Sequence, residues 1–522
     1  MSTAPPEQVP LRTWIAVLAG LLGAFMAVLD IQITNASLKE ILGSLSATQE
    51  EGSWISSAYL VAEVIAIPLT GFMATVFSIR RYLLVNVTLF LIFSTLCGVA
   101  WNLESMIVFR ALQGFTGGVL IPMAMVLVTR FLPPSKRPVG LALFGITATL
   151  APTLGPTVGG WLTTIYSWPV IFYINWAPGL VLLAGVAWGL DSEPMQLKAL
   201  RGADWFGIAV MAIGLGSLTA MLEEGNSKNW FDSNFIRIAA LLAVSGIGLW
   251  IWRGLSAKQT FIDLRIFARP SFLIASVIAF TTGLGLYGSA FILPLFLGQI
   301  AGYTPLAIGQ VILWMGLPQI FIMPFAARLS TMVDNRILLT IGLILFSGSC
   351  FMNTGMTVDT AGPELIAAQV VRALGQPFVM ITITNFATLG VPPTQLPSAA
   401  GMFNMMRNLG GSVGIASLAT LLTLREQFHS GRIGETVSLY DPLTRARLET
   451  LTQSFMARGA EANVAPEMAV RALDNLVRKQ SFVMAYNDAF LLLGVSLLAC
   501  LILVWMGQRV IAGGGPRPAE AH

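Results

Sequence analysis

Charged side chains that lie inside otherwise apolar stretches of sequence are the first candidates for chemistry, and three of them could act together. Asp30 and Glu63 are carboxylates within two long hydrophobic runs, and Arg110 lies in a third. A charged group inside a membrane is costly, so such a residue is a candidate for function by default. A carboxylate there can bind and release a proton, since burial favours its neutral form and a neighbouring guanidinium favours its charged form.

Counting residues along each run gives the depths of these groups. The helix that carries Glu63 begins near Gly52, so Glu63 lies roughly 16 Å along it, near the middle of a hydrocarbon core about 30 Å thick. Asp30 and Arg110 fall in the outer halves of their runs and can form an ion pair if their helices adjoin. We therefore expect a proton-coupling site at Asp30, Glu63 and Arg110 in a central cavity. The alternative is a structural Asp30–Arg110 pair that only fixes packing.

Uncharged polar groups and a second arginine in the apolar runs are candidates for a substrate cavity. Amides inside a membrane also serve as hydrogen bonds between helices, which is the alternative for each of them. The candidates are Asn35, Gln113, Arg372, Gln376, Asn404 and Asn408. Cys97, Cys350 and Cys500 stand alone in apolar runs without metal-ligand spacing, so we expect packing roles and no metal site.

The composition indicates a membrane-spanning architecture around these groups. Of the 522 residues, 55% are hydrophobic and 11% are charged, against about 25% charged in ordinary globular proteins. Long apolar runs exclude a soluble multidomain protein, and the net charge of +4 gives no reason to expect nucleic acid. We predict an all-α protein with fourteen transmembrane helices, at 12–36, 53–76, 82–101, 104–130, 138–163, 168–190, 204–222, 235–254, 271–299, 306–328, 337–357, 363–389, 398–424 and 485–509.

One connection is long and polar. Residues 425–484 separate the last two predicted spans, and within them 442–459 and 464–480 have the spacing of amphipathic helices. Basic residues favour the cytoplasmic side and so give the orientation. With the N-terminus inside, sixteen Lys and Arg residues fall on the inner side and three fall in short outer loops. We therefore predict that both termini are cytoplasmic and that 425–484 lies outside.

The chain contains a weak internal repeat. RALQG at 110–114 and RALGQP at 372–377 each lie a few residues into a span that begins outside. Repeated halves are common in secondary transporters. We therefore predict two six-helix bundles with the seventh and eighth spans inserted between them. The expected parts are an N-terminal bundle (1–190), a linker with the inserted pair (191–270), a C-terminal bundle (271–510) and a cytoplasmic tail (511–522).

The fifth predicted span is rich in glycine and proline, which weaken isolated helices but are tolerated between packed membrane helices. These residues are Pro152, Gly155, Pro156, Gly159 and Gly160. We expect them to permit close contact with the opposite half of the molecule, as a hinge or seal. The alternative is a kinked, tightly packed helix. In the inner loop after the second span, Gly71, Arg80 and Arg81 are either a cytoplasmic gate or simple anchors at the membrane surface.

Several stretches, taken in order, resemble the motifs of one transporter family. They are LDIQITNASL at 29–38, RALQGFTGGVLIP at 110–122, APTLGPTVGG at 151–160, SWPVIFYINWAPG at 167–179 and GMFNMMRNLGGSVGIA at 401–416. Their order and spacing are similar to those of the 14-helix drug:proton antiporter branch of the major facilitator superfamily. Thr75 and Ser78 depart from the Asp and Gly of that family's inner-loop motif.

The resemblance implies proton-driven efflux of hydrophobic drugs or toxic compounds across the bacterial inner membrane, by antiport with alternating access. It implies no enzymatic reaction and no cofactor, with the proton gradient as the driving force. The implied partners are hydrophobic small-molecule substrates, a periplasmic adaptor protein of the EmrA/HlyD type and an outer-membrane channel of the TolC type. The segment 425–484 either contacts the adaptor or only caps the outer mouth.

Three other functions compete with this one. A dedicated exporter of one endogenous metabolite, such as a fatty acid or siderophore, would have the same architecture. An uptake symporter for a polar metabolite would need more charged groups within the spans than this chain has. An enzyme is disfavoured because no HExxH zinc motif occurs and because His429 and His522 lie outside the predicted spans.

Overall fold

The computed structural model describes residues 9–133, 135–256, 264–392, 395–438 and 440–506, which are predominantly helical. The N-terminal half contains α1 (Leu11–Ala36), α2 (Leu38–Leu45), α3 (Gln49–Phe77), α4 (Ile79–Gly98), α5 (Leu103–Gly117), α6 (Leu120–Phe131), α7 (Arg137–Ile165), α8 (Val170–Tyr173) and α9 (Trp176–Gly189). The middle contains α10 (Lys198–Arg201), α11 (Trp205–Gly225), η1 (Trp230–Asp232) and α12 (Asn234–Ser256). The C-terminal half contains η2 (Leu264–Ala268), α13 (Pro270–Gln299), α14 (Pro305–Ser330), α15 (Asn335–Met352), η3 (Asn353–Gly355), α16 (Gly362–Thr388), α17 (Leu396–Thr436), α18 (Pro442–Ala457) and α19 (Ala465–Met506).

These helices confirm the predicted all-α membrane architecture. Within the described residues, twelve helical segments are long and apolar enough to cross a membrane, or thirteen when the bent α7 counts as one span. The remaining predicted span, 398–424, falls on α17, whose central residues are more polar. The predicted spans 104–130 and 168–190 are each interrupted, so that the first becomes α5 and α6 and the second becomes α8 and α9.

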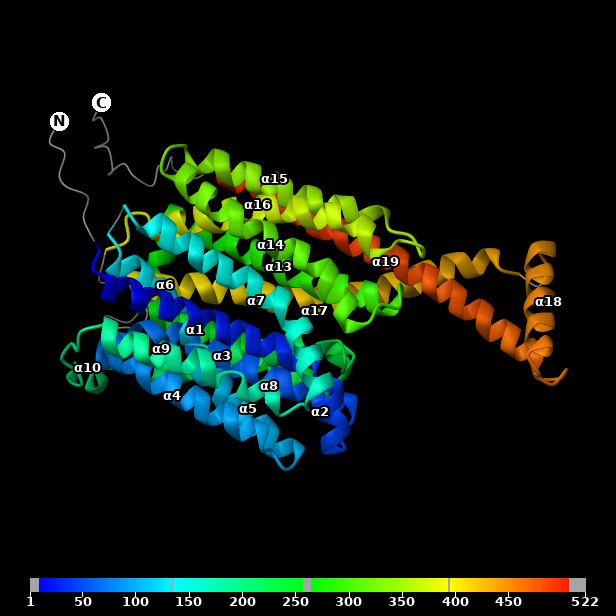
Figure 1. Ribbon diagram of the computed structural model, residues 1–522, viewed down its shortest axis with the longest axis horizontal. Coiled ribbons are helices and arrows are strands. Elements are labelled where there is room, and N and C mark those ends of the chain that lie inside the picture. Colours follow the sequence, from blue (N-terminus) through cyan, green and yellow to red (C-terminus); the bar gives the residue numbers. More distant parts are fainter. Residues whose placement is uncertain (1–8, 134, 257–263, 393–394, 439, 507–522) are drawn as a thin grey trace.

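The two halves of the chain form two groups of helices that lie side by side (Figure 1). α1 begins and α19 ends at the same end of the molecule, as an even number of crossings requires. The halves meet where α7 packs against α14 and where α3 and α6 pack against α17. Near the start of α7, a small apolar cluster joins α7, α14 and α16 through Ala142, Met323, Ala326, Ala327 and Ile381.

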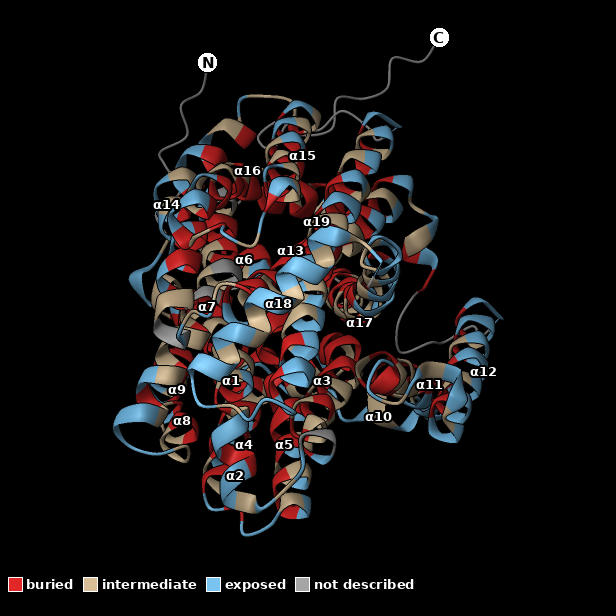
Figure 2. Ribbon diagram, turned by 90° about the vertical axis from the view of Figure 1, so that its right-hand side faces the viewer, coloured by how far each residue is buried: buried red, intermediate tan, exposed pale blue. Residues whose placement is uncertain are grey.

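The middle helices α11 and α12 pack as a pair at one side of the molecule (Figure 2). α11 contacts α3 of the N-terminal half and α17 of the C-terminal half. α12 packs mainly on α11, and most of its surface is not buried. The pair therefore lies at the junction of the two halves, with α11 in contact with both.

The long connection at 425–484 is a helical projection and not an irregular loop. α17 continues beyond the bundle to Thr436, and α19 begins at Ala465 and runs without a break into the last span. The helices have 41 and 42 residues. Each is therefore about 60 Å long, about twice the thickness of the hydrocarbon core. α18 crosses their ends at the tip (Figure 1).

The projection differs from the prediction in one element. The expected helix at 442–459 is α18, but the expected helix at 464–480 is the first part of α19. At the base, an ionic contact joins α17 to α19, because Arg425 Nε donates to Asp488 Oδ2 at 2.6 Å and His429 Nε2 lies 2.7 Å from the same oxygen. The amphipathic pattern was correct, but it could not show that the helix continues into the membrane span.

Candidate functional site

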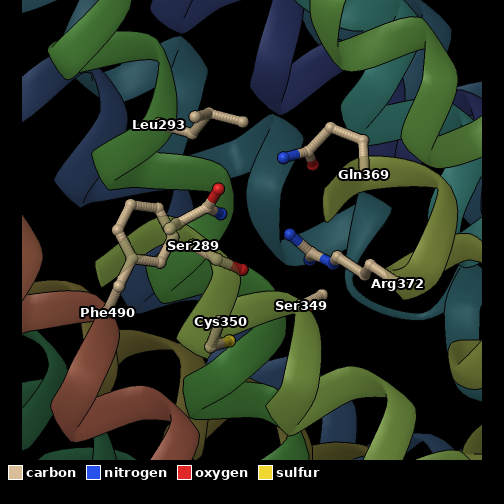
Figure 3. Close-up of a pocket in the computed structure, with 8 residues that line it drawn as sticks. Ser289, Leu293, Ser349, Cys350, Gln369, Arg372 and Phe490 are labelled. Atoms are coloured by element: carbon tan, nitrogen blue, oxygen red, sulfur yellow. The ribbon is translucent and has the colours of Figure 1, made fainter. Parts of the chain in front are cut away.

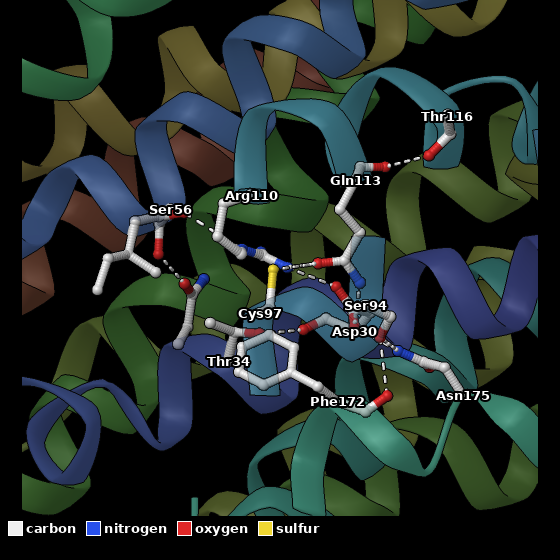
Figure 4. Close-up of polar contacts among 12 residues, drawn as sticks. Asp30, Thr34, Ser56, Ser94, Cys97, Arg110, Gln113, Thr116, Phe172 and Asn175 are labelled. Carbon is white, nitrogen blue, oxygen red and sulfur yellow. Dashed lines mark hydrogen bonds and ion pairs between the residues drawn. The ribbon is translucent and has the colours of Figure 1, made fainter. Parts of the chain in front are cut away.

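Asp30 lies at the centre of a buried hydrogen-bond network in the N-terminal half (Figure 4). Its Oδ2 accepts from Arg110 Nη1 at 2.7 Å. Its Oδ1 accepts from Gln113 Nε2 at 3.0 Å and from Asn175 Nδ2 at 2.6 Å. The side chains of Asp30 and Arg110 are 1% and 0% exposed. The expected ion pair is therefore present, and it joins α1, α5 and the residue that precedes α9.

The Arg110 guanidinium has further partners besides Asp30. Its Nη1 donates to Gln113 Oε1 at 2.8 Å, and its Nε donates to the Ile55 carbonyl at 3.3 Å. The group also lies 4.3 Å from the centre of the Tyr59 ring. Buried charges are tolerated when they are paired and hydrogen-bonded, so this network holds Asp30 and Arg110 in a fixed geometry. A proton added to Asp30 would weaken the contact among three helices.

Glu63 lies in a cavity between the two halves. The volume open to the centres of water molecules is about 80 Å³, well below the roughly 300–1,000 Å³ of sites for drug-sized ligands. The polar lining comes from both halves and from α11, and consists of Gln32, Asn35, Glu63, Glu223, Tyr287, Asn408 and Ser412. The other lining residues are apolar, apart from Gly411. The halves must therefore move apart before the cavity can admit a large apolar ligand.

The Glu63 carboxylate is held much less firmly than that of Asp30. Glu63 is 3% exposed, and no described residue donates a hydrogen bond to its carboxylate. The basic group whose charge acts most on it is Arg407 of α17, which is 2% exposed. Asp30 and Arg110 do not line this cavity. The three predicted proton-coupling groups therefore lie in two places, one in the cavity and two inside the N-terminal half.

Two buried carboxylates of α11 were missed in the sequence analysis. Glu223 lines the cavity together with Glu63, and its Oε1 is buried without a hydrogen-bond partner. Glu224 is fully buried and accepts hydrogen bonds from Ser53 Oγ and Ser57 Oγ of α3, at 2.8–3.0 Å. The predicted span 204–222 ended one residue too early, whereas α11 continues to Gly225. The pair of adjacent acidic residues at the end of this apolar run was the sequence signal that could have identified them.

Only some of the residues predicted for the substrate cavity line it in the structure. Asn35 and Asn408 line the cavity, and Asn35 Oδ1 accepts from Ser56 Oγ at 2.5 Å. Gln113 belongs to the Asp30 network. Asn404 lies where α17 meets α6, since its Nδ2 donates to the Ala400 carbonyl at 2.8 Å and lies 3.5 Å from the sulfur of Met125. Of these four residues, only Asn35 and Asn408 face the cavity.

Arg372 and Gln376 lie inside the C-terminal half, away from the cavity at Glu63. Arg372 lines a separate small pocket (Figure 3). Gln376 Oε1 accepts from Gln319 Nε2 at 3.3 Å, which links α16 to α14. Neither residue lines the cavity between the halves. The repeated sequence around Arg110 and Arg372 therefore places an arginine inside each half.

Gly155 and Gly159 of α7 pack against α1 of the same half, so the expected contact with the opposite half was wrong for these two glycines. A Cβ added to Gly155 would lie 2.2 Å from the Cβ of Gln32, and one added to Gly159 would lie 2.9 Å from the Ile33 carbonyl oxygen. Contacts of α7 with the opposite half include Thr157, which lies against Gly309 of α14, and Gly145, where an added Cβ would lie 2.1 Å from Met323 Cε. α7 bends by 44° between residues 152 and 154. A sealing role for Pro152, Gly155, Pro156, Gly159 and Gly160 stays a prediction.

The inner-loop arginines contact their own half. Arg80 Nη2 donates to the Ala187 carbonyl at 2.7 Å, and Arg81 Nη2 donates to Ser192 Oγ at 3.1 Å. Gly71 is buried within α3. These contacts join the start of α4 to the end of α9 and to the residues just after it, which agrees with anchoring. A gate at Gly71, Arg80 and Arg81 stays a prediction for another conformation.

Comparison with known proteins identifies close relatives over the full length. The chain is 31% identical over 501 residues to the colistin resistance protein EmrB of Acinetobacter baumannii, covering 96% of this chain and 97% of the relative. It is 30% identical over 508 residues to the multidrug export protein EmrB of Escherichia coli, covering 96% of each. It is 29% identical over 512 residues to the fatty acid resistance protein FarB of Neisseria gonorrhoeae, covering 98% and 99%.

A solved structure shares the fold at much lower identity. The human organic anion transporter MFSD10 superimposes with a TM-score of 0.57, over 95% of this chain and 100% of that chain, at 15% identity. This likeness concerns the fold alone. The sequence profile of the Major Facilitator Superfamily matches residues 20–415. With two helical halves around a central cavity and relatives that align from end to end, the chain belongs to the Major Facilitator Superfamily.

Proposed function

We propose that this protein exports hydrophobic drugs or toxic compounds across the bacterial inner membrane in exchange for protons, by alternating access. The observation that carries the proposal is Glu63, a buried carboxylate in a largely apolar cavity between the halves, to which no residue of the described chain donates a hydrogen bond. Relatives named as a colistin resistance protein and a multidrug export protein, at 31% and 30% identity over their full length, support it.

Coupling follows when proton and substrate compete for the same carboxylate. With the cavity open to the outside, protonation neutralises Glu63 and weakens its attraction for a cationic substrate, which leaves. With the cavity open to the inside, an arriving substrate favours the charged form and the proton leaves. The proton gradient then drives export, because proton uptake is favoured on the outer side and proton loss on the inner side.

The Asp30–Arg110 pair is the second coupling element of the proposal. Protonation of Asp30 removes the charge that holds Arg110 and weakens the links among α1, α5 and α9. A local change of charge of this kind can shift the balance between two conformations of a packed structure. In this division of roles, Glu63 exchanges protons with the cavity, and Asp30 couples protonation to helix packing.

The cavity lining favours hydrophobic cations as substrates. Glu63 and Glu223 supply two carboxylates from different helices, and the apolar remainder suits a hydrophobic body. The second candidate is a dedicated exporter of an endogenous metabolite such as a fatty acid. The likeness to FarB, named a fatty acid resistance protein, supports it. In that case the buried Arg407 would bind the carboxylate of the substrate.

The proposal includes the orientation and the partners. Both termini are cytoplasmic, and the helical projection at 425–484 then extends on the periplasmic side. A polar helical tip on that side suits contact with a periplasmic adaptor of the EmrA/HlyD type, which would connect the pump to a TolC-type outer-membrane channel. α18 packs on α19 but has no buried residue, so most of its surface is available for such a contact.

Transport into reconstituted vesicles with an imposed proton gradient tests this function. We expect gradient-driven uptake of cationic hydrophobic compounds, with weaker transport of neutral and acidic ones. Glu63→Gln should still bind substrate but should not accumulate it against a gradient. Glu449→Gln, the same substitution on the exposed face of α18, is the matched control and should transport normally. Unchanged uphill transport by Glu63→Gln would refute the proposed coupling.

A further inference from the structure

Arg372, a buried arginine of the C-terminal half, has no carboxylate partner within the described part of the chain. It is 3% exposed, and its one hydrogen bond there runs from Nη2 to the Leu286 carbonyl at 3.2 Å. Its guanidinium lies 4.9 Å from the centre of the Phe346 ring, and its Nε has no partner. An unpaired charge in a protein interior is strongly unfavourable. The charge of Arg372 therefore calls for a balancing group.

The guanidinium of Arg372 points into a small cavity of the C-terminal half (Figure 3). The volume open to the centres of water molecules is about 10 Å³, which corresponds to a single particle of about the size of a water molecule. Gln369 and Asn353 also line the cavity, and they are 2% and 4% exposed. Their side-chain amides make no hydrogen bond to any described residue. Three buried groups thus have N–H donors available to a ligand in the cavity.

The lining of this cavity contains N–H donors and the unpaired amide oxygens of Gln369 and Asn353, but no acid among the described residues. No Asp or Glu is among the lining residues. The Ser349 hydroxyl donates to the Phe346 carbonyl at 2.6 Å, and the Ser289 hydroxyl donates to the Gly285 carbonyl. The proton of each hydroxyl is therefore used in a hydrogen bond within its own helix. The charge of the Arg372 guanidinium favours a small anion and repels a cation, and the amide N–H groups of Gln369 and Asn353 can donate to that anion.

In the N-terminal half, the position beside the buried arginine is occupied by the carboxylate of Asp30. Asp30 and Ser289 each stand nineteen residues after the first residue of their helix, α1 and α13. Each lies beside the arginine of its half, and each arginine stacks on an aromatic ring. The N-terminal half supplies a carboxylate at this position, whereas the C-terminal half supplies a serine and a cavity.

We propose that the cavity at Arg372 binds one chloride ion, which takes in the C-terminal half the place that the Asp30 carboxylate has in the N-terminal half. A water molecule would satisfy hydrogen bonds but would leave the charge of Arg372 unbalanced. The ion stabilises the contact among α13, α15 and α16, which carry Ser289, Cys350 and Arg372. The stability of the folded protein, and with it transport, therefore depends on chloride.

Binding of radioactive chloride to the purified protein, together with its Tm in chloride and in gluconate, tests this site. We expect saturable binding of one ion per chain and a Tm that rises with the logarithm of the chloride concentration above the Kd. Arg372→Gln should lose both effects. Arg478→Gln, on an exposed arginine of the projection, is the matched control and should keep both. Absence of saturable binding in the wild type would refute the site.

A second variant keeps the test decisive if Arg372→Gln fails to fold. Ser289→Asp places a carboxylate beside Arg372, so this variant should have the same Tm in chloride and in gluconate. Ser289→Asn, of nearly the same size but uncharged, should retain the chloride dependence. If Ser289→Asp and Ser289→Asn respond equally to chloride, the proposal is wrong. A crystal grown in bromide should show an anomalous peak beside Arg372, and a water molecule alone at that place would contradict the proposal.

Discussion

Arg110 and Arg372 are buried arginines in the two halves of the molecule, and they differ in the groups that balance and bind their charge. Arg110 binds Asp30 at 2.7 Å and donates two further hydrogen bonds. Arg372 has one backbone partner in the described structure and faces a small cavity. Protonation can switch a carboxylate but not a carbonyl, so the proposed coupling to the proton gradient assigns the switch to the N-terminal half. The described residues that line the cavity at Arg372 include no carboxylate.

Breaking the Asp30–Arg110 ion pair of the N-terminal half should have the largest effect. Asp30→Asn leaves Arg110 buried without a counter-charge, which typically costs about 3–5 kcal/mol. We expect a large fall in Tm and loss of gradient-driven transport, measured on purified protein and in vesicles. Asp191→Asn is the control, because Asp191 pairs with Arg12 on the surface, where ion pairs contribute little. Undiminished uphill transport by Asp30→Asn would remove Asp30 from the mechanism.

The next largest effect should come from enlarging one tightly packed glycine in each half. These substitutions test whether the two halves are packed alike although their arginines have different partners. Gly159 of α7 meets the Ile33 backbone of α1, and Gly414 of α17 meets the Leu284 backbone of α13 in the same way, each at 2.9 Å from an added Cβ. Gly159→Leu and Gly414→Leu should each destabilise the fold by about 1–3 kcal/mol through overpacking. Gly248→Leu, where an added Cβ meets nothing within 4 Å, should be neutral in the same thermal assay.

That packing prediction has a clear contrary result. If Gly414→Leu is tolerated while Gly159→Leu is not, then the two halves differ in packing as well as in charge. Normal export by Gly159→Leu would also count against a sealing role for the glycines of α7.

A smaller effect separates the two carboxylates of the cavity. Glu223→Gln removes a charge that α11 contributes beside Glu63, so cationic substrates should bind more weakly by on the order of tenfold, equivalent to about 1.4 kcal/mol. Neutral substrates should bind as before, and proton coupling through Glu63 should persist. Equilibrium binding of a cationic and a neutral fluorescent compound measures the difference. Equal losses for both compounds would show that Glu223 acts through packing and not through its charge.

The smallest expected effect is a chloride response, which should appear when the N-terminal half is made more like the C-terminal half. Asp30→Ser gives the N-terminal half the serine that the C-terminal half has beside its arginine. We expect this variant to be destabilised like Asp30→Asn but to be partly rescued by chloride, with a Tm higher in chloride than in gluconate. Transport should remain lost, since chloride cannot be protonated under these conditions. An identical chloride response in Asp30→Ser and in the wild type would show that the vacated N-terminal position does not accept an anion.

The sequence predicted the spans and the Asp30–Arg110 pair because both depend on position along a helix. Hydropathy and residue counts give the depth of a group in the membrane. They do not give the direction in which its side chain points, so Asp30 and Glu63 were assigned to one site although only Glu63 faces the cavity. Arg372 was assigned to a substrate cavity for the same reason.

Other features depend on where a helix ends or on tertiary contacts. Glu223 was missed because the predicted span stopped one residue before it, and helix ends are the least certain part of such predictions. The segment 425–484 showed amphipathic spacing, but its continuity with α19 depends on packing beyond the bundle. The residues that Gly155 and Gly159 contact depend on how α1 packs against α7. A local sequence pattern does not reveal that packing.

Proton release on substrate binding is the most direct test of the central claim that Glu63 exchanges a proton for the substrate. A cationic substrate is added to the purified protein in weakly buffered detergent solution, and a pH indicator records the released protons. The wild type should release protons, and its affinity for the substrate should increase with pH because deprotonation favours binding. Glu63→Gln should bind without release and with an affinity that no longer depends on pH. Proton release by Glu63→Gln equal to that of the wild type would contradict the account.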